Sequence, residues 1–244
     1  VTYANNNASN PWRTIGRASW GSTNRDARNS AEAAKAGDVV LVSARTYSGT
    51  GTNSRSEILY YQENNGTAGN PITFKANGIV NLTQTGSGAI IGSYRRNYIV
   101  WDGFTINEAT AMSNPDTGPV TIFECTGCVL QNLNINGNGD ANGRMDNHNG
   151  IRIESSSNIT VRNNRIQNVY TDHNVYNGAC IMTYSSQGLT IENNYFSDCG
   201  SGVFIKGGPF SSQITSTSVV RYNLFENVYE NRGGDLSGGC IALH

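Results

Sequence analysis

The sequence predicts an all-β solenoid, because from Tyr98 onward it repeats itself about every 30 residues. Each copy has a short segment of alternating apolar and polar residues, a polar turn built on Asn, and a second apolar pair. Alternation with a period of two indicates strands rather than helices, and a repeat of this length indicates stacked units rather than one globular core. The clearest copies begin at Val129, Ile159, Leu189 and Val219.

A second set of alternating segments lies in the same part of the chain, so each repeat is expected to carry more than one strand. This set comprises residues 150–154, 180–184, 202–206 and 240–244. The connections between strands vary in length, and long loops of a solenoid collect on one face. The loops are expected at residues 107–118, 136–149, 168–178 and 226–238.

Asparagine residues recur where each first strand ends. We interpret them as structural corner residues, because Asn tolerates the left-handed backbone of such corners and its amide can hydrogen-bond along the stack. They form two series, Asn163 with Asn193, and Asn164 with Asn194 and Asn223.

The first third of the chain has a different character. Residues 31–36 read Ala-Glu-Ala-Ala-Lys-Ala, with Asn29 or Ser30 as N-cap and Gly37 as terminator, which predicts a helix. An open end of a solenoid has to be covered, so we expect this helix to be the N-terminal cap. Strands are expected to follow at residues 38–42, 57–61 and 72–76. The chain would then be one continuous domain, with the cap and first coils in residues 1–75 and further coils in 76–244.

Four segments carry a resemblance to a known family: residues 10–15, 34–42, 46–47 and 69–76. They resemble the opening of the right-handed parallel β-helix proteins of the pectate-lyase-like superfamily, in particular the branch with polysaccharide lyase families 6 and 9. The resemblance implies an all-β, single-stranded right-handed parallel β-helix, a solenoid with an N-terminal capping helix. No C-terminal cap is in view, so we expect a further domain or subunit to stack on the C-terminal end.

Composition excludes some partners. The chain has 18 acidic and 17 basic side chains, a net charge of −1, which gives no general attraction to nucleic acid or to an anionic membrane. No apolar run approaches the roughly 18 residues of a membrane span. The sequence begins at Val1 rather than Met, so either a leader was removed or the sequence is trimmed. With its polar, weakly charged surface, we expect a secreted or cell-surface protein.

The cysteine count is odd, at five, so at least one cysteine is unpaired. Cys125 and Cys128 have the spacing of a metal knuckle or a redox pair, but no second CxxC or nearby CxxH completes a zinc site. We interpret the cysteines as small apolar residues buried in the stack. The other three are Cys180, Cys199 and Cys240.

Strand alternation aligns several chemically active side chains. If Ile151, Ile181 and Val203 point inward, then Glu154, Tyr184, Lys206 and His244 point outward in one column, at the spacing of neighbouring strands, about 4.8 Å. An acid, a phenol, an amine and an imidazole on one face are a concentration of proton-transfer groups, and they are our first candidates for an active site.

The family resemblance implies a reaction for this column of side chains. A lyase acting on a uronic-acid polysaccharide needs a base, a group that neutralises the carboxylate, and sometimes an acid. Lys206 falls where family 6 relatives carry their lysine, and Arg221 resembles their partner arginine. We therefore expect a polysaccharide lyase that cleaves an acidic glycan by β-elimination. The expected catalytic residues are Lys206, Arg221, Tyr184 and His244, and the expected substrate-binding residues are Glu154, Arg152, Phe204 and Tyr176.

Other interpretations stay open at this point. Arg162, Glu192 and Arg221 occupy equivalent outward positions, which would also suit a structural charge ladder. Family 6 relatives bind Ca²⁺ through an Asn and two acids before the lysine, whereas here Asp198 is the one acid in that stretch, a weak candidate ligand for Ca²⁺. The signatures of β-helix galacturonan hydrolases are missing, which argues against hydrolysis by paired carboxylates. The alternative from another class is a non-catalytic β-helix: a glycan-binding adhesin, a surface filament or a phage tail-spike segment.

Overall fold

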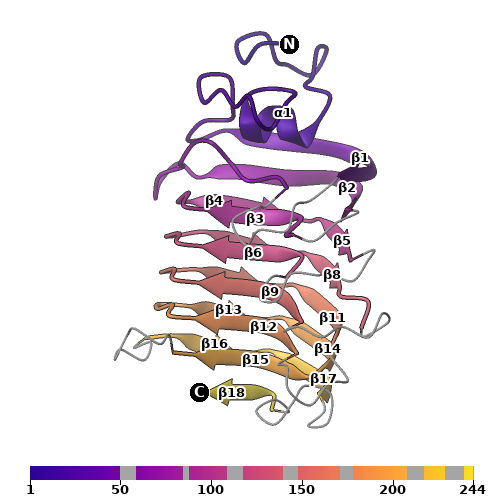
Figure 1. Cartoon of the computed structure of the whole chain (residues 1–244), viewed down its shortest axis with the longest axis vertical. Coiled ribbons are helices and arrows are strands. Elements are labelled where there is room, and N and C mark those ends of the chain that lie inside the picture. Colours follow the sequence, from indigo (N-terminus) through magenta and orange to yellow (C-terminus); the bar gives the residue numbers. More distant parts are fainter. Residues whose placement is uncertain are drawn as a thin grey trace.

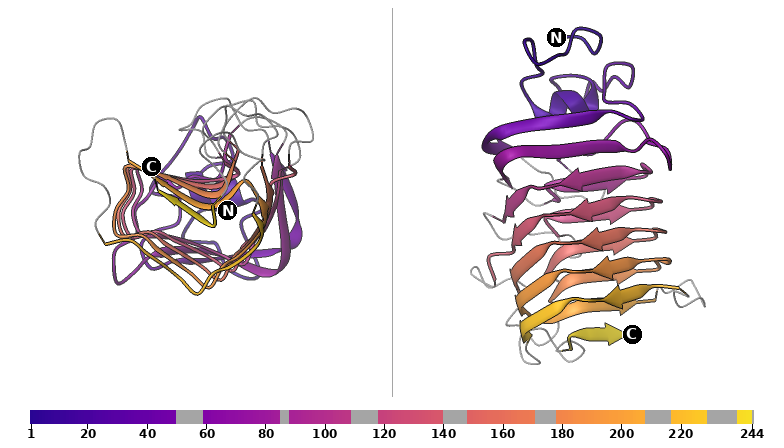
Figure 2. Two further views of the ribbon diagram at one scale, coloured as in Figure 1. Left: turned by 90° about the horizontal axis from the view of Figure 1, so that it is seen from below. Right: turned by 180° about the vertical axis from the view of Figure 1, so that it is seen from behind.

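The computed structural model of the chain is a right-handed parallel β-helix in which strands of successive coils stack along one axis (Figure 1). The structure describes residues 1–49, 59–84, 88–108, 118–139, 148–170, 178–207, 217–228 and 239–243. Within these residues, every pairing between named strands is parallel (Figure 2), and the β1–β2 pairing has a register shift between Ser43 and Arg45. The predicted all-β solenoid is confirmed.

Two sheets make up the solenoid. One is six-stranded, in the order β18-β15-β12-β9-β6-β3, and the other is twelve-stranded, with β2 joining its two flanks and pairing with β1. The first contains β3 (Ile91–Tyr94), β6 (Val120–Phe123), β9 (Asn149–Glu154), β12 (Ala179–Tyr184), β15 (Ser201–Lys206) and β18 (Ile241–Leu243).

The twelve-stranded sheet supplies the other two strands of each coil. From β4 onward, the chain visits one strand of each flank and then one strand of the six-stranded sheet. The twelve strands are β1 (Val39–Gly49), β2 (Ile72–Gln84), β4 (Ile99–Asp102), β5 (Thr105–Asn107), β7 (Val129–Gln131), β8 (Asn134–Asn136), β10 (Thr160–Arg162), β11 (Arg165–Val169), β13 (Thr190–Glu192), β14 (Tyr195–Cys199), β16 (Val219–Arg221) and β17 (Leu224–Val228).

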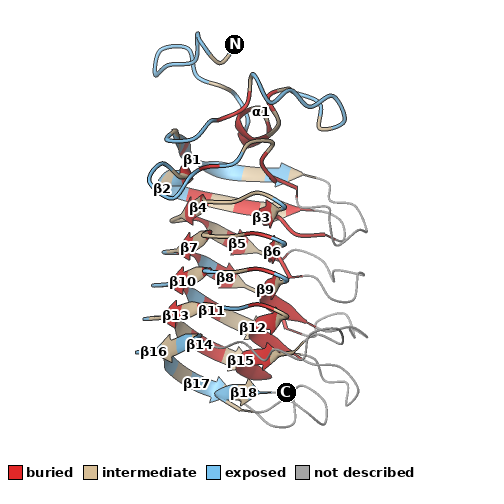
Figure 3. Ribbon diagram, turned by 90° about the vertical axis from the view of Figure 1, so that its left-hand side faces the viewer, coloured by how far each residue is buried: buried red, intermediate tan, exposed pale blue. Residues whose placement is uncertain are grey.

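Inward-facing aliphatic side chains form the core. Ile151, Ile181 and Val203 align on adjacent strands, and all three are fully buried. Towards the N-terminus the core also contains aromatic residues: the rings of Phe74 and Trp101 stack with their centroids 4.6 Å apart. Because each coil repeats the same inward positions, apolar surface is buried continuously along the axis (Figure 3).

The asparagine corners are structural, as interpreted from the sequence. The Asn194 Oδ1 atom accepts hydrogen bonds from the Asn164 backbone N–H (3.0 Å) and side-chain amide (2.9 Å), and Asn194 in turn donates to Asn223 Oδ1. The preceding residue in each coil, such as Asn163 or Asn193, has the left-handed backbone, with φ of 56° and 55°. The ladder satisfies polar groups that would otherwise be unpaired inside the stack.

The predicted capping helix is wrong in position. The helix of the cap is α1 (Ile15–Trp20), which begins at the Thr14 N-cap and ends at Gly21 in the left-handed conformation. Residues 29–36 form turns instead, because their amides bond elsewhere: Asn29 N–H donates to the Trp20 carbonyl, and Ala34 N–H donates to the Ala18 carbonyl. Contacts with α1 thus override a run whose intrinsic helix propensity is good but whose length is marginal.

Two of the expected early strands are present and one is not. Residues 38–42 and 72–76 fall largely within β1 and β2, which extend much further than expected. Within the expected strand 57–61, residues 57 and 58 lie outside the described residues. Leu59 and Tyr60 form a turn, although their amides still donate to the carbonyls of Ala89 and Ile90. Among the described residues, no helix is long and apolar enough to span a membrane.

The cysteines differ in part from the interpretation as buried thiols. Cys180, at the start of β12, and Cys199, at the end of β14, form a disulfide with a Cα–Cα separation of 5.7 Å. Cys125 and Cys128 are buried free thiols, and Cys240 is an exposed one. Sequence spacing alone cannot show the disulfide, because its two cysteines are 19 residues apart and meet only through the coil geometry.

Replacing Asn194 by Ala should lower the free energy of unfolding by about 2–4 kcal/mol, because it removes partners from several buried polar groups. Chemical denaturation of wild type and variant measures this. The control is Asn193→Gly at the neighbouring exposed corner, where Gly adopts the left-handed backbone without strain. Equal losses in the two variants would contradict a stabilising role for the buried ladder.

Candidate functional site

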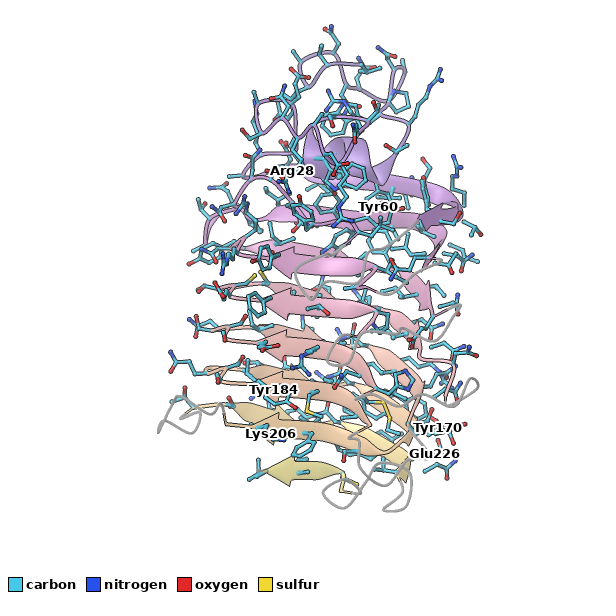
Figure 4. All side chains as sticks on the ribbon, in the orientation of Figure 1. Arg28, Tyr60, Tyr170, Tyr184, Lys206 and Glu226 are labelled. Atoms are coloured by element: carbon cyan, nitrogen blue, oxygen red, sulfur yellow. A yellow bond between two sulfur atoms is a disulfide. The ribbon has the colours of Figure 1, made fainter. Side chains whose placement is uncertain are left out.

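The outer face of the six-stranded sheet carries a line of half-buried side chains. Strand register aligns Tyr94, Phe123, Glu154, Tyr184 and Lys206, one at the last position of each strand from β3 to β15. We call these residues the outer column. Glu154, Tyr184 and Lys206 are thus adjacent, as the alternation of the sequence indicates, and Figure 4 shows Tyr184 and Lys206 on neighbouring strands.

The column is the accessible part of this face. In β9, β12 and β15 every residue except the last is buried, so that both faces of these strands are largely covered. The residues two positions before the column, Arg152, Met182 and Phe204, are 2%, 0% and 1% exposed. In these three strands, only the last residues therefore present side chains to a ligand.

Tyr184 lies between two cations. The guanidinium carbon of Arg152 is 4.3 Å from the centre of the Tyr184 ring, and the Lys206 ammonium is 5.5 Å from it. Cations over an aromatic ring are attracted by its electron-rich face, more strongly where water is excluded. Arg152 also donates from Nε to Glu154 Oε2 at 3.0 Å. Arg152, Glu154, Tyr184 and Lys206 therefore form one connected group.

Phe204, an expected substrate-binding residue, is buried. It packs in a small apolar cluster with Ala179 and Met182, against which Tyr184 also packs. A ring that is 1% exposed has no free face on which a sugar can stack. Arg152, the other residue expected to touch substrate from this row, is likewise buried. The structure gives it contacts with Tyr184 and Glu154 instead.

The N-terminal half of the column is aromatic. The rings of Tyr94 and Phe123 stack with centroids 5.4 Å apart, and the Arg95 guanidinium lies 5.0 Å from the Tyr94 ring. Tyr61 packs beside Tyr94, with Arg25 and Arg28 each over its ring. Sequence reasoning missed this part, although Tyr94 and Phe123 precede Glu154 at the same period of about 30 residues.

Arg221 is on the other sheet. It lies on β16, in register with Glu192 on β13, and its Nη2 atom is 2.7 Å from Glu192 Oε2. The hydrogen bond and charge of Glu192 raise the pKa of Arg221. The same register continues through Arg162, Gln131 and Asp102. Arg162, Glu192 and Arg221 therefore form the charge ladder that the sequence also allowed. Arg221 and Lys206 lie on different sheets.

The remaining sequence candidates have less support from geometry. Asp198 accepts one hydrogen bond, from Asn227 Nδ2 at 3.4 Å. Among the described residues there is no group of three or more His, Cys, Asp or Glu side chains that could hold a metal ion, whereas Ca²⁺ takes six to eight oxygen ligands. Asp198 as a ligand for Ca²⁺ therefore stays a prediction. His244 and Tyr176 lie outside the described residues.

A buried acid–imidazole pair lies away from the column. The His148 Nε2 atom is 2.8 Å from Glu108 Oε2, and both side chains are almost fully buried. His148 Nδ1 donates to the Tyr170 carbonyl at 2.9 Å, because a carbonyl oxygen can only accept. Together with the Tyr170 carbonyl, this buried pair links the ends of β5 and β11 to the start of β9.

Comparison with known proteins places the chain in a family. The family described as "Right handed beta helix region" matches residues 50–243. The chain belongs to this right-handed β-helix family. No curated protein matches it. A similar solved structure is a mannuronic-acid-specific polysaccharide family 6 lyase from human gut microbiota, 16% identical, with a TM-score of 0.46. The match covers 94% of this chain and 48% of that structure, so the chain spans about half its length.

Replacing Arg152 by Met should lower the free energy of unfolding by on the order of 3 kcal/mol, because it removes a buried charge that contacts both Glu154 and Tyr184. Denaturant unfolding measures the loss. The matched control is Arg221→Met, whose exposed ion pair with Glu192 should contribute far less. If the two substitutions cost the same, the connected group around Tyr184 is not a stabilising unit.

Proposed function

We propose that this chain is an exported carbohydrate-active protein that binds an acidic glycan along the outer column and cleaves it by β-elimination. The observation that carries the proposal is the position of Tyr184 between the cations of Arg152 and Lys206, next to Glu154. A phenol and an amine on adjacent strands can deliver and accept a proton at neighbouring atoms of one substrate.

Charge complementarity supports an anionic ligand. Along this face the cations named above are Arg25, Arg28, Arg95, Arg152 and Lys206, and the acids nearby are Glu63, Glu124 and Glu154. Each of these acids is already in an ion pair with an arginine of the group. Among these named groups, cations outnumber acids by five to three, in a protein whose net charge is −1. Such a face favours a polymer of uronic acids over a neutral glycan.

The proposed reaction uses Lys206 as base and Tyr184 as acid. The amine form of Lys206 accepts the proton at C5 of a uronate residue. The electron pair of that C–H bond forms a C4–C5 double bond while the C4–O bond breaks. The Tyr184 hydroxyl donates its proton to the departing oxygen, and the Arg152 guanidinium over the ring stabilises the negative charge left on the phenolate. No step depends on His244, which lies outside the described residues.

A non-catalytic role is the second candidate, and one observation favours it. Arg221, the expected partner of Lys206 in neutralising the substrate carboxylate, is paired with Glu192 on the other sheet. A β-helix that binds a glycan without cleaving it, as an adhesin, surface filament or tail-spike segment, needs the column but no carboxylate-neutralising partner for Lys206.

The disulfide supports the proposed location. Disulfides form and persist in oxidising compartments and are rare in the reducing cytosol. The Cys180–Cys199 bond lies within the coil stack, where it links a strand of each sheet. An exported protein, secreted or held at the cell surface, would fold where this bond can form.

Lys206→Ala should reduce lyase activity at least about 100-fold, because a general base is removed. The assay is ultraviolet detection of unsaturated uronate from pectate, alginate and glycosaminoglycans, with and without added Ca²⁺. Lys75→Ala, an exposed lysine on the twelve-stranded sheet, is the matched control and should retain activity. Folded wild type that gives no product on any uronan would sink the lyase proposal and favour the binding role.

Binding should depend on glycan length. From Tyr94 to Lys206 the column crosses four strand spacings, roughly 19 Å. Phe123→Ala should weaken binding of a hexasaccharide roughly three- to tenfold and leave a disaccharide unaffected. Calorimetry measures both, with Tyr195→Ala on the twelve-stranded sheet as control. An equal effect of Phe123→Ala on both lengths would contradict a ligand that lies along the column.

A further inference from the structure

Two buried thiols meet at the corner between β6 and β7. Cys125 and Cys128 are 2% and 0% exposed, and each thiol shifts the pKa of the other. The Cys125 sulfur is also 3.3 Å from the Ser93 carbonyl oxygen, and the Cys128 sulfur is 3.5 Å from that of Arg96. Both side chains therefore point to the same interior corner of the coil.

The turn that joins the two cysteines is common to successive coils. Its first and fourth positions are Ser156 and Ile159 in the next coil, and Ser186 and Leu189 in the one after. Cys125 N–H donates to Ser156 Oγ at 3.0 Å, and Ser156 N–H donates to Ser186 Oγ at 3.1 Å.

The backbone of these turns also repeats. The third residue has a left-handed φ in every one of the three: 69° at Gly127, 54° at Asn158 and 64° at Gly188. The two cysteines thus occupy the first and fourth positions of a turn whose backbone the coil repeats.

The electrostatics of the pair suit thiol–disulfide exchange. The hydrogen bond from Cys128 lowers the pKa of Cys125 to about 7, against the cost of burial. The same hydrogen bond, together with burial, raises the pKa of Cys128 well above its usual value. One thiol is therefore the better nucleophile and the other holds the shared proton, as in other paired cysteines of this spacing.

We propose that Cys125 and Cys128 are a second disulfide-forming pair of this chain, oxidised by a low-molecular-weight disulfide. The Cys125 thiolate attacks one sulfur of the small disulfide, forming a mixed disulfide and releasing one thiolate. The Cys128 thiol then loses its proton and its sulfur attacks Cys125, which releases the second small thiolate. Two electrons pass to the small disulfide, and the two thiol protons end on its released halves.

The burial of the pair determines when this can happen. A small disulfide cannot reach a sulfur that is covered on all sides, so oxidation takes place while the coil is forming or when it opens locally. Oxidant present during folding should close the bond, whereas the same oxidant added to folded protein should act much more slowly. This dependence on timing distinguishes the pair from the exposed Cys240.

The test uses Cys240→Ser, which removes the exposed thiol. This variant is unfolded, refolded with a mixture of oxidised and reduced glutathione, then denatured and treated with an alkylating agent. Mass spectrometry of the intact chain and of non-reduced peptides counts and locates the remaining thiols. We expect no alkylated cysteine and a Cys125–Cys128 cross-link in addition to Cys180–Cys199. The same variant folded with a reductant and then exposed to glutathione disulfide should keep both thiols of the pair for much longer.

A matched variant keeps the result decisive. Cys125→Ser with Cys128→Ile, in the Cys240→Ser background, places at the two positions the residue types that the next coil has at Ser156 and Ile159. It should refold and form one cross-link only. The proposal is overturned if Cys125 and Cys128 are both alkylated after oxidative refolding that has joined Cys180 and Cys199. It is equally overturned if either cysteine is found bonded to a different partner.

Discussion

In-register pairing of parallel strands between successive coils is the constraint on which the rest of this protein depends. Because each residue lies opposite the equivalent residue of the next coil, one sequence position becomes a line along the axis. Inward lines of Ile and Val form the core, the corner line of Asn satisfies buried amides, and the outward line from Tyr94 to Lys206 collects the reactive groups. A shift of one residue in any coil would break all three at once.

This constraint explains what the sequence could predict. A period of two within each strand and of about 30 between strands defines both the register and the direction of each side chain, so the alignment of Glu154, Tyr184 and Lys206 follows without coordinates. The corner role of Asn164 and Asn194 follows for the same reason. These are repeated features, and repetition itself is the evidence for them.

Features that occur once, or that depend on a third element, could not be predicted in this way. The helix at Ile15–Trp20 is short and has no repeat, and contacts with it hold residues 29–36 in turns. The burial of Phe204 depends on what covers the outer face of β15, which alternation does not describe. Arg221 was expected to be the catalytic partner of Lys206. It lies instead on the twelve-stranded sheet, where the register pairs it with Glu192. In each case a tertiary contact outweighs the local pattern.

The asparagine ladder also has an evolutionary meaning. Every rung is made by the same atoms of consecutive coils, so a stretch of one coil could be duplicated or deleted and the ladder would close again across the new junction. An insertion or deletion of any other length within the coil would break the ladder. Genes for such a chain can therefore change in whole-coil steps, and each step lengthens or shortens the outer column by one residue. The length of polymer that the outer column could contact would thus depend on the number of coils rather than on new sequence.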